Sequence, residues 1–230
     1  MSPPIHLNPT APLAERVLLP GDPGRALILA QALLDKPRMF NHNRGLWGYT
    51  GTAPDERALT IQSSGMGGPS TAIVVTELAE LGARRIVRVG TCGALDPSLE
   101  LGELLLVGEV VAADGTSRAL GAGERVSAPR ALLDAFALAG ASNPRTVVST
   151  DLFYGHDAQR QREWRAGGAA AVEMECATLF TLAEALKIDA GAVLVVSDLL
   201  KEPPLRIGAE ELRSAERRMG ELAFRALAHV

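Results

Sequence analysis

Residues 83–95, ARRIVRVGTCGAL, are the stretch that decides the fold class of this chain. The apolar run from Ile86 to Val89 is typical of a buried strand, and the glycines at 90 and 93 predict a tight turn directly after it. Arg88 interrupts this run, and a guanidinium inside a buried strand is unfavourable unless an anion or a carboxylate lies beside it. Two interpretations remain open. One is a phosphate-like anion bound at the end of the strand, and the other is a buried structural salt bridge.

Two other segments repeat the order of strand, glycine-rich turn and helix. VLLPGDPGR at 17–25 places Arg25 at the start of an apolar-periodic helix, and SSGMGGPS at 63–70 precedes a second helix. Helix N-termini and glycine-rich turns present free N–H groups, which favour anions. Each segment alone is weak, since such turns are common in α/β proteins. Three of them, two with an arginine, favour an anion pocket.

Composition excludes several classes of protein. The chain has 230 residues, of which 47% are hydrophobic and 22% charged, as expected for a globular domain with a sizeable core. The net charge of −4 gives no reason to expect nucleic acid as a partner. Cys92 and Cys176 lack metal-ligand spacing and are expected to be small core residues in a reduced compartment. With neither a signal peptide nor an apolar run of transmembrane length, we expect a cytoplasmic protein without a membrane partner.

The predicted elements indicate a single α/β domain over residues 1–230, with a mixed central sheet and helices on both of its sides. We expect a proline-rich extended arm over 1–12 and an irregular loop over 114–127. The predicted strands cover 15–19, 46–51, 57–62, 85–91, 103–113, 145–149, 169–174 and 190–197. The predicted helices cover 24–35, 69–81, 129–139, 157–166, 175–187 and 209–228.

Two acidic motifs lie at the ends of predicted strands. In AVEMECATLF, Glu173 and Glu175 lie between a strand and an apolar helix, where a carboxylate could accept from two hydroxyls or cap the helix. In GAVLVVSDLL, Ser197 and Asp198 lie at the carboxyl end of a buried strand, where sites form in open α/β sheets. A capping or turn aspartate is the alternative for Asp198.

Other candidate residues carry weaker signals. His6 lies in the proline-rich arm and Arg44 in FNHNRGLWGY, and both could simply be solvated. Phe153 and Tyr154 could form an aromatic wall or ordinary core, and for Tyr154 we favour ordinary core packing. No serine-hydrolase motif, Walker loop or zinc spacing is present, so we expect neither a covalent nucleophile nor a metal.

Taken in order, the motifs resemble a known family. PGDPGR, NRG, SGMGGPS, RVGTCGA, STDLFY, VEMECATLF and VVSD span nearly the whole chain. Together they resemble the nucleoside phosphorylases with a trimer-of-dimers assembly, a family that holds purine nucleoside phosphorylases and uridine phosphorylases. The resemblance implies a homo-oligomer, a hexamer with shared active sites. It also implies reversible phosphorolysis of a nucleoside, with inorganic phosphate as co-substrate and no cofactor.

The resemblance implies a role for individual residues. The phosphate-binding residues would be Gly21, Arg25, Arg88 and Thr91, with Arg44 reaching in from a neighbouring subunit. The ribose-binding residues would be Met66, Met174 and Glu175, with His6 from the neighbour at the 5′ hydroxyl. The base site would hold Phe153, Val172, Glu173 and Ser197. Asp198 matches the acid that protonates the purine, provided that its surroundings favour the protonated form.

The same resemblance favours purine over uridine. The uridine enzymes carry an insertion with a Gln and an Arg before the VEMEC-like motif and replace the Ser-Asp pair. Here that stretch is short, and Ser197-Asp198 is intact. GMGGPSTAIVV and ECATLFTL are closer to the uridine branch, so uridine phosphorylase is the alternative. The preference between 6-oxo and 6-amino purines stays open.

Three further points remain open in the sequence. The arginine that assists the acid in the purine branch could be Arg206, Arg213 or Arg217. A phosphate-independent nucleosidase would not need Arg25, Arg44 and Arg88 together. A non-catalytic nucleoside- or phosphate-binding protein would keep the arginines without requiring Asp198.

Overall fold

A computed structural model describes residues 4–141, 143–154, 158–201 and 203–230. The strands are β1 Arg16–Leu19, β2 Asp35–Asn41, β3 Gly48–Thr52, β4 Ala58–Gln62, β5 Arg85–Ala94, β6 Leu104–Ala113, β7 Arg125–Ser127, β8 Arg145–Thr150, β9 Ala171–Glu173, β10 Asp189–Leu199 and β11 Leu205–Arg206. The helices are α1 Pro23–Leu33, α2 Gly67–Leu81, α3 Gly115–Ala119, α4 Arg130–Leu138, α5 Ala158–Ala166, α6 Cys176–Leu186 and α7 Ala209–Ala228, with a 3-10 turn, η1, at Asn43–Gly45.

All the strands of the described residues join one mixed sheet. Its order is β11-β10-β6-β8-β9-β5-β1-β4-β3-β2, with β7 on β6, and an additional β10–β5 pairing closes part of the sheet into a ring. β1, β5 and β10 are parallel, with Leu19 and Ala192 both aligned with Arg88. Because their carboxyl ends meet at one edge, the segments that follow them lie close together.

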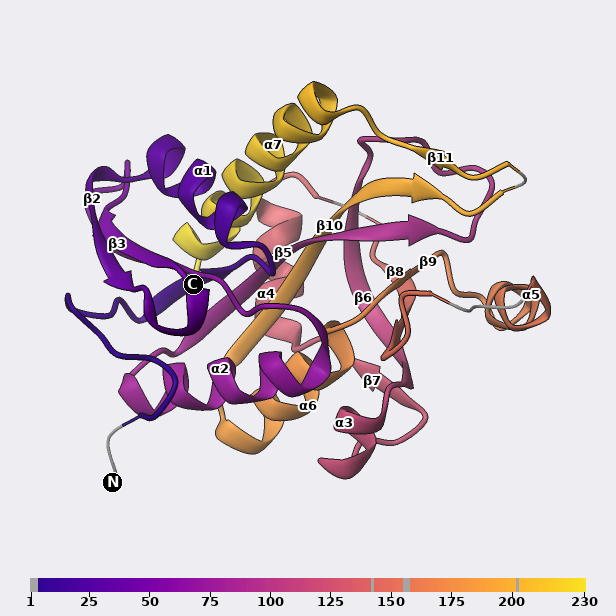
Figure 1. Ribbon diagram of the computed structural model, residues 1–230, viewed down its shortest axis with the longest axis horizontal. Helices are drawn as coiled ribbons and strands as arrows, with labels where there is room; N and C mark the ends of the chain where they lie inside the picture. Colours follow the sequence, from indigo (N-terminus) through magenta and orange to yellow (C-terminus); the bar gives the residue numbers. More distant parts are fainter. Residues whose placement is uncertain (1–3, 142, 155–157, 202) are drawn as a thin grey trace.

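Helices cover both faces of the sheet (Figure 1). On one face, α1, α4 and α7 contribute Leu29, Phe136 and Met219 to a buried core. On the other, α2 and α6 contribute residues such as Val75 and Phe180. The strands between them are apolar on both sides, as expected for a sheet that is covered twice. This arrangement confirms the α/β architecture expected from the sequence.

The tight turn expected at residues 90–93 is wrong. β5 runs on to Ala94, because β10 pairs with it as far as that residue and β9 pairs with Gly93. These two glycines are needed because a side chain would not fit beside their neighbours, and not because the chain turns there. A Cβ at Gly90 would lie 2.6 Å from Nη2 of Arg88, and a Cβ at Gly93 would lie 3.1 Å from Leu200. Gly90 therefore leaves the room that the guanidinium of Arg88 occupies along the strand.

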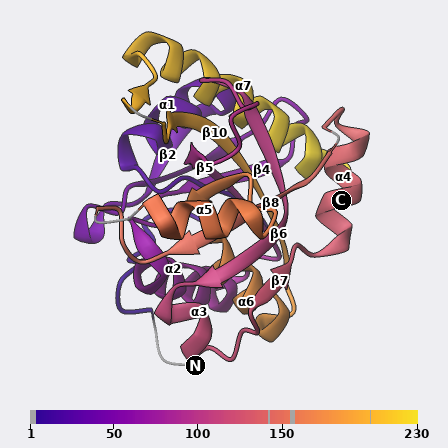
Figure 2. The same ribbon diagram turned by 90° about the vertical axis from the view of Figure 1, so that its right-hand side faces the viewer.

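Other differences lie at the periphery. β2 was not expected, since its sequence contains Pro37 and most of its residues are exposed. The loop expected over 114–127 contains α3, which Asp114 caps through the N–H of Ser117, and the short strand β7. The hairpin strand β11 was also missed. α5 projects from the body, and Figure 2 looks onto it. The first residue of the helix expected over 157–166 lies outside the described residues.

Candidate active site

Arg88 lies between two buried carboxylates. Its Nε is 3.2 Å from Glu173, and its Nη2 is 2.5 Å from Glu175. The Arg88 side chain is 4% exposed, so water screens this cluster poorly. Burial alone would lower the pKa of Arg88, but Glu175 and Glu173 outweigh burial and raise it above the ordinary value. Arg88 therefore stays charged, and the structural salt bridge, the second of the two interpretations, exists.

The carboxylate of Glu173 is filled by donors. Besides Arg88, it accepts a hydrogen bond from the hydroxyl of Ser149. The N–H groups of Glu175 and Cys176 donate to it at 2.9 and 3.0 Å. These two N–H groups belong to the start of α6, where an acidic side chain is favoured. Glu173 thus caps α6 and holds Arg88 in place.

Glu175 keeps acceptor capacity. One of its oxygens receives the N–H of Gly67 at 2.6 Å, and the other pairs with Arg88. An ionised carboxylate offers about four lone-pair sites, so about two remain for other donors such as neighbouring hydroxyls. Burial raises the pKa of Glu175, and the charge of Arg88 counteracts part of that rise.

The turn after β1 brings Gly21 and Arg25 to the same edge. Asp22 caps α1 by accepting from the N–H groups of Gly24 and Arg25. Gly21 lies against this cluster, since a Cβ built on it would be 3.1 Å from the carbonyl oxygen of Gly65 and 3.9 Å from Nη1 of Arg88. The close approach of these backbones explains a glycine at position 21.

Arg25 has a buried partner of its own. Its Nε donates to Glu216 of α7 at 2.7 Å, and its Nη1 lies 3.3 Å from the carbonyl oxygen of Val89. Like Arg88, it is a nearly buried guanidinium beside the middle of β5. Two guanidiniums therefore reach the same edge of the sheet, each held by carboxylates.

Ser197 and Asp198 lie at the carboxyl end of β10, where the register with β5 shifts. The hydroxyl of Ser197 contacts Asp198 at 2.7 Å. The antiparallel strand β11 brings Arg206 opposite Asp198, with its Nε 3.4 Å from a carboxylate oxygen. Arg213 and Arg217 are exposed on α7, and neither forms an ion pair with a residue that the structure describes. Of the three arginines that the sequence leaves open, Arg206 is the partner of Asp198.

Comparison with known proteins identifies the family. The family model described as "Phosphorylase superfamily" matches residues 15–230. This chain belongs to the phosphorylase superfamily. The match covers β5, which carries Arg88, and the end of β10, which carries Asp198, and it confirms the resemblance found in the motifs.

Individual relatives agree with this assignment. A protein of Alkaliphilus metalliredigens named "Purine nucleoside phosphorylase DeoD-type" is 37% identical over 197 residues, covering 82% of this chain and 84% of its own. One of the same name from Clostridium beijerinckii is 32% identical and covers 98% of each chain. The crystal structure of a uridine phosphorylase from Vibrio fischeri superposes with a TM-score of 0.83, at 26% identity, covering 94% of this chain and 92% of that one.

Within this phosphorylase fold, several predicted residues surround the Arg88 cluster. Met66 immediately precedes Gly67, the partner of Glu175, and its side chain is 85% exposed. Val172 pairs with Gly93, while Thr91 is half-buried on β5. Met174 is half-buried between the two glutamates.

Phe153 lies after β8, with its ring edge against Tyr154 at 4.9 Å between centroids. The two rings are 57% and 84% exposed, so neither belongs to the core. The ordinary-packing interpretation of Tyr154 is therefore wrong.

Two predicted residues lie away from this edge. His6 is in the arm, where its ring contacts Glu77 of α2, and Arg44 is exposed in η1 with a left-handed φ of 57°. Arg44 forms no ion pair with any described residue. His6 thus has a partner within its own chain, whereas the side chain of Arg44 is exposed.

Sequence reasoning missed the partners of three predicted residues, namely Ser149 beside Glu173, Glu216 beside Arg25 and Glu77 beside His6. A signal for the two glutamates exists, because each is an acid among apolar positions of an amphipathic helix. Glu77 lies between Val74 and Leu78 on α2, and Glu216 between Ala215 and Met219 on α7. A buried acid on such a face needs a partner.

No group of three His, Cys, Asp or Glu side chains within the described ranges could hold a metal ion. Cys92 and Cys176 are free and buried, and burial raises the pKa of both thiols. Across the same ranges, no helix combines the length and the apolar character needed to cross a bilayer.

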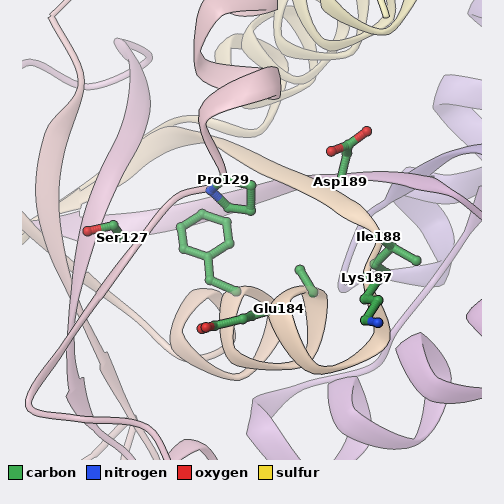
Figure 3. A pocket seen from close by; sticks show the side chains of 8 residues that line it. Ser127, Pro129, Glu184, Lys187, Ile188 and Asp189 are labelled. Atoms are coloured by element: carbon green, nitrogen blue, oxygen red, sulfur yellow. The ribbon is translucent and has the colours of Figure 1, made fainter.

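A separate hollow of about 380 Å³ lies between α6, the start of β10 and the segment before α4 (Figure 3). It is lined by Ser127, Pro129, Phe180, Ala183, Glu184, Lys187, Ile188 and Asp189. Asp189 begins β10, whereas Asp198 lies near its end, so this hollow is at the opposite end of the strand from the candidate site.

Proposed function

We propose that this chain catalyses reversible phosphorolysis of purine ribonucleosides, giving the free base and ribose 1-phosphate. The observation that carries the proposal is Asp198, held by Ser197 and Arg206 at the edge of the sheet that also holds Arg88 and Glu175. An anion site, a hydroxyl acceptor and an acid are the groups that this reaction needs. The names of the relatives support the same reaction.

Phosphate is already an anion, so no protein base has to activate it. Arg88 and Arg25 would hold it with the backbone around Gly21 and the hydroxyl of Thr91, and the partner subunit's Arg44 would complete the site. The carboxylates of Glu173, Glu175 and Glu216 keep the guanidiniums rigid before phosphate arrives. Fixing phosphate below the anomeric carbon lowers the barrier through orientation.

The sugar becomes oxocarbenium-like as the glycosidic bond breaks. Glu175 would accept from the 2′ and 3′ hydroxyls with its remaining lone pairs, while Met66 and Met174 pack against the ring. Because Glu175 also touches Arg88, one carboxylate connects the sugar site with the phosphate site.

A purine leaves poorly as an anion, and Asp198 would therefore donate a proton to N7 from its protonated form, which requires that it first gain a proton and give up its ionic contact with Arg206. Phe153, Val172, Glu173 and Ser197 are proposed to line the base site. The oxygens of Glu173 already accept hydrogen bonds from Arg88, Ser149 and the start of α6. Glu173 would therefore act by positioning Arg88 and α6 and not by binding the base directly. We expect the reaction to need no metal and no cofactor.

Rival functions remain distinguishable. Uridine phosphorylase is the alternative within the family, supported by the similar Vibrio fischeri structure. A nucleosidase would not need the two held guanidiniums, and a binding protein would not need Asp198. The test is release of free base from inosine, adenosine, guanosine and uridine, each with and without phosphate. Purine release that requires phosphate is expected. A clear preference for uridine, or release without phosphate, overturns the proposal.

We infer a hexamer in which subunits share active sites. The exposed Arg44 and the partly exposed His6 support this, as do the exposed apolar residues Ile5 on the arm, Trp47 just after η1 and Ile73 on α2. The free cysteines in the core agree with a cytoplasmic enzyme.

Shared sites predict complementation between defective subunits. Arg44→Ala and Asp198→Asn should each be nearly inactive alone. In a mixed dimer, the Arg44→Ala subunit keeps its own Asp198 and receives an intact Arg44 from its partner. Equal random mixing makes about half of the dimers mixed, and in each mixed dimer one of the two reciprocal sites is complete. About a quarter of all sites should therefore be restored. Activity is measured after co-refolding and verification of mixed oligomers; no recovery in those oligomers contradicts shared sites.

Glu175→Gln should impair ribose recognition selectively. The amide keeps the shape but loses the charge that strengthens hydrogen bonds from hydroxyls. We expect kcat/KM for inosine to fall about 10- to 100-fold, and for 2′-deoxyinosine to fall less. Glu184→Gln, on the exposed side of α6, the helix that follows Glu175, is the matched control and should change neither. An equal fall in kcat/KM for both nucleosides would show that Glu175 supports the structure and does not recognise the 2′ hydroxyl.

A further inference from the structure

One carboxylate, that of Glu77, accepts several hydrogen bonds from the N-terminal arm. The N–H groups of Ile5, His6 and Leu7 donate to Glu77 of α2 at 3.1, 3.0 and 2.6 Å. Nδ1 of His6 lies 2.7 Å from the same carboxylate. In Figure 1 the arm, in indigo, passes beside α2. Burial alone would raise the pKa of Glu77, but these donors outweigh burial and lower it.

This geometry fixes the state of the His6 ring. An ionised carboxylate only accepts, so the proton of a neutral ring lies on Nδ1 and Nε2 keeps a lone pair. The ring is partly exposed, with 26% of its side chain accessible. His6 therefore offers an acceptor nitrogen at the surface of its own chain, in an orientation set by Glu77.

A second set of bonds joins the arm to the segment that carries Arg44. The amide of Asn43 donates to the carbonyl oxygen of His6 at 2.9 Å. The side-chain oxygen of Asn41 accepts from the N–H of Asn8 at 2.9 Å. His6 and Arg44 thus belong to segments that are hydrogen-bonded to each other, although the sequence separates them.

We propose that Glu77 is a positioning residue for substrate recognition. It fixes His6 in the Nδ1-protonated form and presents Nε2 to the 5′ hydroxyl of a nucleoside bound in the partner subunit. This inference rests on the proposed function. A purely structural anchor would need only the backbone N–H groups, whereas here the carboxylate also binds the ring.

The test compares inosine with 5′-deoxyinosine in the whole enzyme with saturating phosphate. Glu77→Gln should lower kcat/KM for inosine about 3- to 10-fold, the loss expected for a neutral hydrogen bond between Nε2 and the 5′ hydroxyl, and should spare 5′-deoxyinosine. In a His6→Ala background the same substitution should have no further effect. Glu80→Gln, on the exposed side of α2, is the matched control and should leave both substrates unchanged.

Two readouts separate this inference from the proposed function. The ¹⁵N shifts of the His6 ring report its tautomer, and amide exchange of residues 5–7 reports docking of the arm. The unmodified protein should show the Nδ1-protonated form, and Glu77→Gln should lose it. Both readouts can be measured even if no nucleoside is phosphorolysed. In that case the proposed function fails, while the control of the His6 ring by Glu77 is still tested.

The inference is overturned by equal losses on both substrates or by an unchanged tautomer. If Glu77→Gln does not fold, Glu77→Asp serves instead, because it keeps the charge and withdraws the carboxylate by one methylene. That variant must then show the selective loss, and a uniform loss overturns the inference.

Discussion

Asp198→Asn is expected to lower the turnover of purine ribonucleosides about 10²- to 10⁴-fold, the range for loss of a general acid. Asparagine keeps the size of the side chain and can still accept from Ser197, but it has no proton to transfer. It also loses the ionic contact with Arg206, which is 73% exposed, so the fold should lose little stability. Steady-state turnover with inosine measures the effect.

The leaving base determines how large the loss should be. 7-Methylguanosine carries an already activated base, which departs without a proton at N7, so its turnover should be largely spared. The turnover of adenosine should fall most. The asparagine amide can still donate a hydrogen bond to the 6-oxo group of inosine or guanosine, whereas adenosine has a 6-amino group in that position and gains no such bond. Asp189→Asn makes the same change at the opposite end of β10 and is the matched control. Equal losses on all bases, or none on any, would remove Asp198 from the chemistry.

Arg88→Ala should affect both activity and stability. It leaves two buried carboxylates, on Glu173 and Glu175, without their cation, and breaking a buried ion pair in this way costs about 3–5 kcal/mol. We therefore expect a clear fall in Tm together with loss of phosphorolysis. Thermal unfolding, followed alongside the phosphate dependence of the rate, measures both.

Arg88→Lys separates the two effects. Lysine keeps the charge but not the planar fork that can bind two carboxylates and an anion at once. We expect this variant to fold and its kcat/KM for phosphate to fall about 10- to 100-fold, the size of a lost charge-assisted hydrogen bond. Arg84→Lys, just before β5 and exposed, is the matched control. Normal saturation by phosphate in a folded Arg88→Lys enzyme would leave Arg88 as a structural ion pair only.

These experiments matter because both interpretations of Arg88 can hold together. The salt bridges to Glu173 and Glu175 occupy Nε and Nη2, while Nη1 faces Gly21. A guanidinium has five donors, so it can be held by carboxylates and still present N–H groups to an anion. The same reasoning applies to Arg25, which Glu216 holds from α7.

The sequence by itself determined the α/β fold and the strand ends that carry the candidate site. Apolar runs such as Ile86–Val89, and the apolar face of α7, are local patterns in the sequence, and the structure has a strand and a helix at these positions. Motif order was sufficient for the family, since each motif follows a strand or opens a helix. Edge elements such as β2 and β11 escaped prediction, because exposed or very short strands have little apolar pattern.

Only the tertiary structure decided the partners of the charged groups. Arg25 and Glu216 are 191 residues apart in the chain, and Glu77 meets the arm across about 70. The glycines at 90 and 93 could equally have formed a turn, and it is the pairing of β5 with β10 and β9 that keeps the strand extended. Likewise, Arg206 was one of three equal candidates until β11 brought it opposite Asp198. The physical reason is common to all of these cases. A buried charge or an extended backbone is stabilised by whichever group packs against it, and contacts between distant residues leave no local pattern in the sequence.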